Sequence, residues 1–141
     1  MDYICDAPPH TWFRLVSHGE AIEESRLMQH AVERYFREAY EEVRASYAPP
    51  SGGRFIEQNI GLKDYIQRVM PMFLTLRDNE GKALATAMLP PRDRSVSGFR
   101  PIIVGPNNTD PYHEYGEQIA ALSKHLGLPL EHQRCYPYQR G

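Results

Sequence analysis

Three proline pairs divide this 141-residue chain into separate segments. Pro8-Pro9 blocks a helix, Pro49-Pro50 ends one and Pro90-Pro91 ends a strand, because proline lacks a backbone N–H and restricts the residue before it. No further linker and no internal repeat divides the chain, and its length suits one domain. We therefore expect a single globular domain over residues 1–141, with an irregular N-terminal lead-in and a Pro/Tyr-rich C-terminal tail.

The segment from about Glu20 to Ser46 has the clearest helical pattern. Ser17 and Glu20 form the S-x-x-E capping box that begins many helices. Apolar residues then recur at spacings that place them on one helix face, namely Met28, Val32, Tyr35, Ala39 and Val43. The pattern predicts a long N-terminal helix.

The segments beyond Pro50 predict a shorter helix, a small sheet and a last helix. A short middle helix is expected over 62–70, and a hairpin over 73–77 and 82–89 turns at Gly81. Residues 101–104 are expected to form a third strand, and residues 12–16 are either a strand or an extended anchor. The C-terminal helix is expected to begin with Asp110 as its N-cap and to end at Gly127.

These elements predict an α+β fold. It contains a small antiparallel or mixed sheet, with the long N-terminal helix, the short middle helix and the C-terminal helix on one face. An α/β arrangement, in which residues 102–104 lie parallel to a hairpin strand, is the alternative.

The charge balance and the termini limit the classes of function. Sixteen basic and 18 acidic residues give a net charge of −2, so a large phosphate-binding surface is not expected. The start has no signal-peptide pattern, and no apolar run approaches the roughly 18 residues of a membrane span. Cys5 and Cys135 lack CxxC spacing, which favours reduced thiols, with a terminus-to-terminus disulfide as the alternative. We expect a cytoplasmic protein without membrane association.

Three sequence pieces together follow a known order of motifs. Residues Glu24–Tyr35 match part of the pattern Glu-Gly-x-x-Met-x-His-Cys-Val-Gly-x-Tyr. Residues 74–86 are similar to a strand-turn-strand segment, and Gly105–Asn108 to a Gly-x-x-Asn turn. With an apolar lead-in at Trp12, they resemble the PcfJ-like family of conjugative plasmids, phages and other mobile elements, over roughly residues 12–108. The family's activity is poorly defined, so the resemblance implies a setting and no particular reaction.

This chain departs from the family motif at three positions. Ser25 and Glu33 replace its two glycines, and Ala31 replaces its cysteine. The interval between Tyr35 and the hairpin is also long. If the family's cysteine acts chemically, this chain lacks that group.

His30 is the candidate catalytic residue. On a continuous helix, Arg26, Glu33 and Arg34 lie one turn away, and a carboxylate there would orient the imidazole as an acid or base. A half-exposed helix histidine without a function is the simpler alternative. No nucleophile is specified by spacing, and the six histidines form no zinc pattern, so we expect no metal and no cofactor.

The loop around Asn107 and Asn108 is a candidate anion site. It joins a strand to a helix N-terminus, where free N–H groups favour a negative charge. The side chains that would add charge or hydrogen bonds are Arg77, Arg92, Arg94, Arg100, Asn107 and Asn108. Asp110 opposes an anion there, and a plain strand-to-helix turn is the alternative.

Tyrosines beside prolines form a candidate interaction surface, consisting of Tyr112, Tyr136 and Tyr138. Such aromatic surfaces suit protein partners or stacked bases, while packing of the tail onto the domain is the alternative.

Two main hypotheses follow. The first is a non-enzymatic binding or accessory module of a mobile element or phage, with a protein partner or a second copy of the chain. The second is an enzyme acting on a phosphorylated or nucleotide substrate, with His30 as acid or base. A nucleic-acid accessory protein is a third, less favoured reading.

Overall fold

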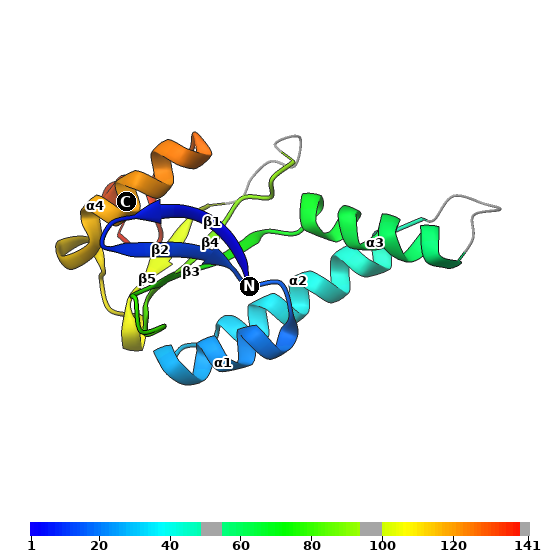
Figure 1. Ribbon diagram of the computed structural model, residues 1–141, viewed down its shortest axis with the longest axis horizontal. Helices are drawn as coiled ribbons and strands as arrows, with labels where there is room; N and C mark the ends of the chain where they lie inside the picture. The colour runs from blue at the N-terminus through cyan, green and yellow to red at the C-terminus, as the bar shows by residue number, and fades with distance from the viewer. Residues whose placement is uncertain (49–54, 94–99, 139–141) are drawn as a thin grey trace.

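The computed structural model describes residues 1–48, 55–93 and 100–138, without the side chains of residues 55–60. A five-stranded sheet has the order β1-β2-β3-β4-β5, and every neighbouring pair is antiparallel (Figure 1). The strands are β1 (Asp2–Ala7), β2 (His10–Arg14), β3 (Met72–Arg77), β4 (Ala83–Leu89) and β5 (Ile102–Val104). The helices are α1 (His18–Met28), α2 (Val32–Ser46), α3 (Phe55–Val69) and α4 (Tyr112–Leu126), with short 3₁₀ turns η1 (Pro106–Asn108) and η2 (His132–Arg134).

Helices cover both faces of the sheet. Leu74 and Leu76 of β3 pack with Leu122 of α4 on one face. Phe73, which points the opposite way, packs with Phe36 of α2 on the other. Since both faces are buried, β3 and β4 consist of nearly continuous apolar residues.

The α+β class is confirmed, but the expected arrangement of the helices is wrong in two respects. They lie on two faces of the sheet instead of one, and two strands precede the first helix. The α/β alternative is also wrong, because Thr86 pairs with Val104 in an antiparallel ladder.

The N-terminal lead-in forms a hairpin. Asp2–Ala7 pairs with His10–Arg14, and Pro8-Pro9 occupies the turn. The sequence did not predict β1, because this edge strand is largely exposed and lacks a continuous apolar pattern. On β2, the indole Nε1–H of Trp12 donates to the Gln118 carbonyl oxygen at 2.9 Å, which attaches the hairpin to α4.

The long N-terminal helix is two helices. The expected start is confirmed, since Ser17 Oγ accepts from the Glu20 N–H at 3.2 Å. Gln29 then adopts a left-handed conformation with φ 54°, which ends α1, and α2 begins at Val32. Because of this interruption, the apolar face of α2 does not continue the apolar face of α1 at the spacing of one helix. Phe36 is therefore buried, whereas Tyr35 is 46% exposed, contrary to the expected helix face.

Other local predictions hold with shifted boundaries. The hairpin of β3 and β4 is confirmed, with Gly81 at φ 82°. The middle helix is longer than expected and starts at Phe55. The N-cap of α4 is Pro111 and not Asp110 as expected, although Asp110 Oδ1 accepts from the Tyr112 N–H at 2.9 Å; Gly127 ends the helix at φ 66° as expected.

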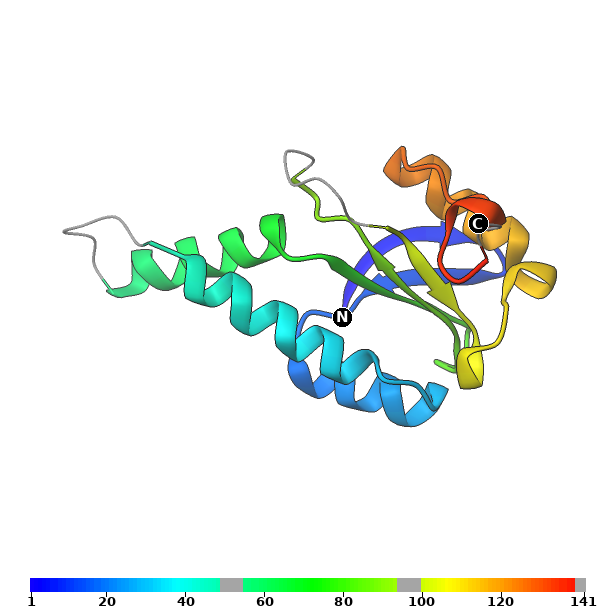
Figure 2. The same ribbon diagram turned by 180° about the vertical axis from the view of Figure 1, so that it is seen from behind.

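Figure 2 shows α2 and α3 side by side, running away from the sheet, while the C-terminal segment lies near α4 and β5. In the part of the chain that the structure describes, no helix combines the length and apolar character needed to cross a bilayer.

The break after α1 leads us to expect different effects on the free energy of unfolding from substitutions at Phe36 and at Tyr35. Phe36→Ala removes a ring that is 2% exposed and contacts Phe73, so we expect a loss of about 3–5 kcal/mol in the free energy of unfolding. Tyr35→Ala is the matched control, with an expected change within about 0.5 kcal/mol. Chemical denaturation measures both. Equal losses would contradict the burial assigned to this face of α2.

Candidate functional site

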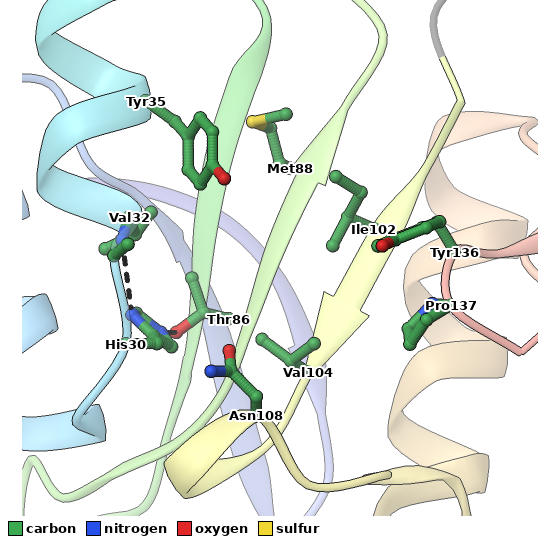
Figure 3. A pocket seen from close by; sticks show the side chains of 11 residues that line it. His30, Val32, Tyr35, Thr86, Met88, Ile102, Val104, Asn108, Tyr136 and Pro137 are labelled. Carbon is green, nitrogen blue, oxygen red and sulfur yellow. Dashed lines mark hydrogen bonds between the residues drawn. The ribbon is translucent and has the colours of Figure 1, made fainter.

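A pocket of about 350 Å³ lies over β4 and β5. The start of α2 forms one wall and the segment around Tyr136 forms the other, with η1 at one end (Figure 3). Its lining residues are His30, Ala31, Val32, Tyr35, Thr86, Met88, Ile102, Val104, Asn108, Tyr136 and Pro137. The volume is at the lower end of the range for small-molecule sites.

The pocket is largely apolar and carries no fixed charge on its described lining. Met88, Ile102 and Val104 form its floor. Tyr35 and Tyr136 rise from opposite walls and remain 46% and 53% exposed. An ionised ligand would lose hydration here without gaining an opposite charge, so the lining favours an uncharged group.

A hydrogen-bonded chain starts at the polar end of the pocket and continues into the core. His30 Nε2 lies 2.9 Å from Thr86 Oγ1. The Thr86 hydroxyl donates to Glu24 Oε2, and Arg77 Nη2 donates to Glu24 Oε1 at 2.6 Å. Glu24 is completely buried, so its carboxylate depends on these two donors in place of water.

The chain determines the tautomer of His30. Because the single proton of the Thr86 hydroxyl goes to Glu24, Thr86 accepts from His30, and Nε2 carries the imidazole proton. His30 Nδ1 is then the acceptor for the Val32 N–H at 3.4 Å. Both ring nitrogens are therefore engaged within the protein.

Burial lowers the pKa of His30 below its ordinary value of 6.5. The negative charge of Glu24 acts in the opposite direction and is the weaker influence. The neutral ring that the hydrogen bonds require is thus also the form that burial favours.

Left-handed residues position both polar side chains at this end. Gln29 at φ 54° precedes His30, which therefore lies in the link between α1 and α2. Asn107 and Asn108 follow β5 at φ 58° and 60°, a conformation that asparagine tolerates better than most residues. Figure 3 shows the Asn108 carboxamide pointing toward the pocket.

The neighbours expected for His30 on a continuous helix are not its partners. Arg26 pairs with Glu23, and Glu33 contacts His18 and Arg37. Because His30 lies in the break between helices, its ring is directed to Thr86 and, through it, to Glu24.

The arginines expected at an anion site lie in different places. Arg77 is engaged with Glu24, and Arg92 lies 4.0 Å from Asp64 of α3. Arg100 is exposed, and Arg94 falls outside the described residues. None of the three described arginines lines the pocket that contains His30.

The loop asparagines and the tail tyrosines divide between sites. Asn108 lines the His30 pocket, whereas Asn107 lines a neighbouring one with Lys82 and Asp110. Tyr136 also lines the His30 pocket.

The other two tyrosines pack the C-terminal segment against the domain. The Tyr112 hydroxyl donates to the Leu130 carbonyl oxygen at 2.6 Å, and the Tyr138 hydroxyl donates to that of Ile103 at 2.9 Å. Both cysteines are buried and free, and burial raises their pKa, which makes reactive thiolates unfavourable.

Sequence reasoning did not identify Glu24, Thr86 or the apolar floor as parts of the site. One signal was available for Glu24. It lies three residues after Ala21 and four before Met28, so it occupies the buried stripe of α1. A carboxylate in such a stripe requires a buried partner.

Within residues 1–48, 55–93 and 100–138, no group of three or more potential ligands is placed to hold a metal ion. Comparisons of the chain with protein-family models, with curated proteins and with solved structures found no match.

Two adjacent glutamates test the buried chain. Glu24→Gln leaves the Arg77 charge without its partner, so we expect a loss of about 3–5 kcal/mol in the free energy of unfolding. Glu23→Gln removes an exposed pairing with Arg26 and should have little effect. Urea denaturation of both variants measures the difference. A stable Glu24→Gln variant would contradict the role of this ion pair.

The lowered pKa of His30 predicts a loss of stability in acid. Below pH 6.5 the unfolded chain protonates His30 more readily than the folded protein does, so stability falls as the pH falls. His30→Gln removes this contribution. We expect the loss of stability between about pH 7.5 and about pH 5 to be smaller in the variant. An unchanged pH dependence would show that His30 is not buried as a neutral ring.

Proposed function

We propose that the protein is a non-enzymatic binding or accessory module and that the His30 pocket is its binding site. The observation that carries this proposal is a chain of hydrogen bonds that already uses the reactive groups of the pocket. The Thr86 proton and both His30 nitrogens are engaged. To act as a general base, His30 would have to exchange its hydrogen bond from the Val32 N–H for a substrate proton.

The convergence of the motif residues supports the resemblance to the PcfJ-like family. Glu24 and His30 belong to the first motif, Arg77 and Thr86 to the strand-turn-strand segment, and Asn108 to the turn. Four of these residues form the hydrogen-bonded chain, and Asn108 lines the same pocket as His30. We propose, from this resemblance, a cytoplasmic protein of a mobile element or phage.

A protein partner, or a second copy of the chain, is the occupant that we favour over nucleic acid. The exposed rings of Tyr35 and Tyr136 suit a protein contact. The described lining of the pocket lacks the Lys or Arg side chains that would contact phosphates.

One observation favours the alternative, an enzyme acting on a phosphorylated or nucleotide substrate. Burial keeps His30 neutral, which suits a general base. The same pocket has no cation among its described lining residues to bind a phosphate, so the alternative has less support.

Uncharged and anionic probes distinguish the two functions. We expect toluene and phenol to perturb the NMR signal of the Met88 methyl group, and phenyl phosphate to perturb it much less, because the pocket lacks a cation. Ala31→Trp should reduce the response by filling the pocket from an exposed position. Glu38→Trp, on the exposed face of α2, is the matched control.

Preference for phenyl phosphate, together with His30-dependent hydrolysis of it, would replace this proposal with the enzymatic one. Failure of every probe to perturb Met88 would contradict the pocket as a binding site.

A further inference from the structure

We propose that the pocket binds an aromatic side chain that carries a hydrogen-bond donor. The side chain that fits this description best is a tryptophan of a partner protein. This inference rests on the proposed function, because it takes the His30 pocket as the binding site. It specifies the chemistry of the group that enters.

The apolar floor requires an apolar occupant of substantial size. Met88, Ile102 and Val104 are partly exposed in the free protein, so a ring lying on them would remove apolar surface from water. The volume of about 350 Å³ has room for a two-ring side chain. Aromatic residues are also the common anchors of protein interfaces.

The polar end of the pocket offers acceptors to such a ring. Thr86 is only 3% exposed, and after accepting from His30 and donating to Glu24 it keeps one lone pair and has no proton to donate. Within the described chain, no group hydrogen-bonds the Asn108 carboxamide, which points into the same space. The indole N–H of tryptophan, which only donates, matches an acceptor placed beyond an apolar floor.

The rim favours a protein side chain over a nucleobase. Tyr35 and Tyr136 face each other across the floor, and both present large exposed rings to a partner surface. A nucleobase would place several ring nitrogens and carbonyl groups against Met88, Ile102 and Val104, which offer no hydrogen bonds.

A series of blocked amino acids tests the occupant. We expect N-acetyl-tryptophanamide to perturb the Met88 and Val104 methyl signals at the lowest concentration. Its 1-methylindole counterpart should bind about ten-fold more weakly, because it has lost the donor. N-acetyl-tyrosinamide should bind more tightly than N-acetyl-phenylalaninamide for the same reason.

Two adjacent variants locate the acceptor. Asn108→Gly removes the carboxamide without backbone strain, because glycine readily adopts the φ of 60° found there. We expect it to weaken N-acetyl-tryptophanamide binding by about five-fold or more. Asn107→Gly is the matched control, because Asn107 has a similar φ of 58° but lines the neighbouring pocket. The affinity of this variant for N-acetyl-tryptophanamide should remain within about two-fold of that of the unmodified protein.

The outcomes separate this inference from the proposed function. Equal binding of the indole and its methylated form, or tighter binding of adenosine or uridine at Met88, would overturn the tryptophan assignment while keeping the pocket as the binding site. If toluene and phenol also failed to bind there, the proposed function itself would be contradicted.

Discussion

The buried carboxylate of Glu24 is the constraint on which the site depends. It lies on α1 with no exposed surface, so water cannot solvate it. Arg77, at the end of β3, supplies the opposite charge, and its own guanidinium is held by Thr75 Oγ1 at 2.9 Å and the Gly81 carbonyl oxygen at 3.1 Å. Thr86 of β4 supplies the second donor. These contacts fix α1 to the central strands, because separating them would leave a charge without a partner in the core.

The position of α1 then determines the shape of the pocket. The left-handed Gln29 ends α1 beside β4, and His30 continues the hydrogen-bonded chain from Thr86. The next helix starts with a new rotation, which buries Phe36 and leaves Tyr35 at the rim. A continuous helix would direct His30 to its helical neighbours and bury Tyr35 instead. The interruption therefore creates both the polar end and one aromatic wall.

Local features of the sequence predicted much of the fold, whereas long-range contacts remained hidden. The Ser17 cap, the Gly81 turn and the Gly127 helix end depend on a few adjacent residues, and all three occur. The helix break at Gln29 has no such signal, because neither glycine nor proline marks it. His30, Asn108 and Tyr136 were identified from the sequence, but their common pocket depends on pairing between β4 and β5. The partners of Arg77 could not be inferred for the same reason, since Glu24 lies 53 residues away.

The residue at position 31 determines whether the pocket contains a nucleophile. Ala31 is the N-cap of α2 and lines the pocket beside His30. A cysteine at this position, as in the motif that the sequence resembles, would lie at the positive end of a helix dipole, where the thiolate is favoured. The hydrogen-bonded residues from His30 to Arg77 would then position the wall of a pocket that contains a nucleophile. With the methyl group of alanine, no nucleophile lies at this position, and the wall borders a largely apolar pocket with a few uncharged polar groups.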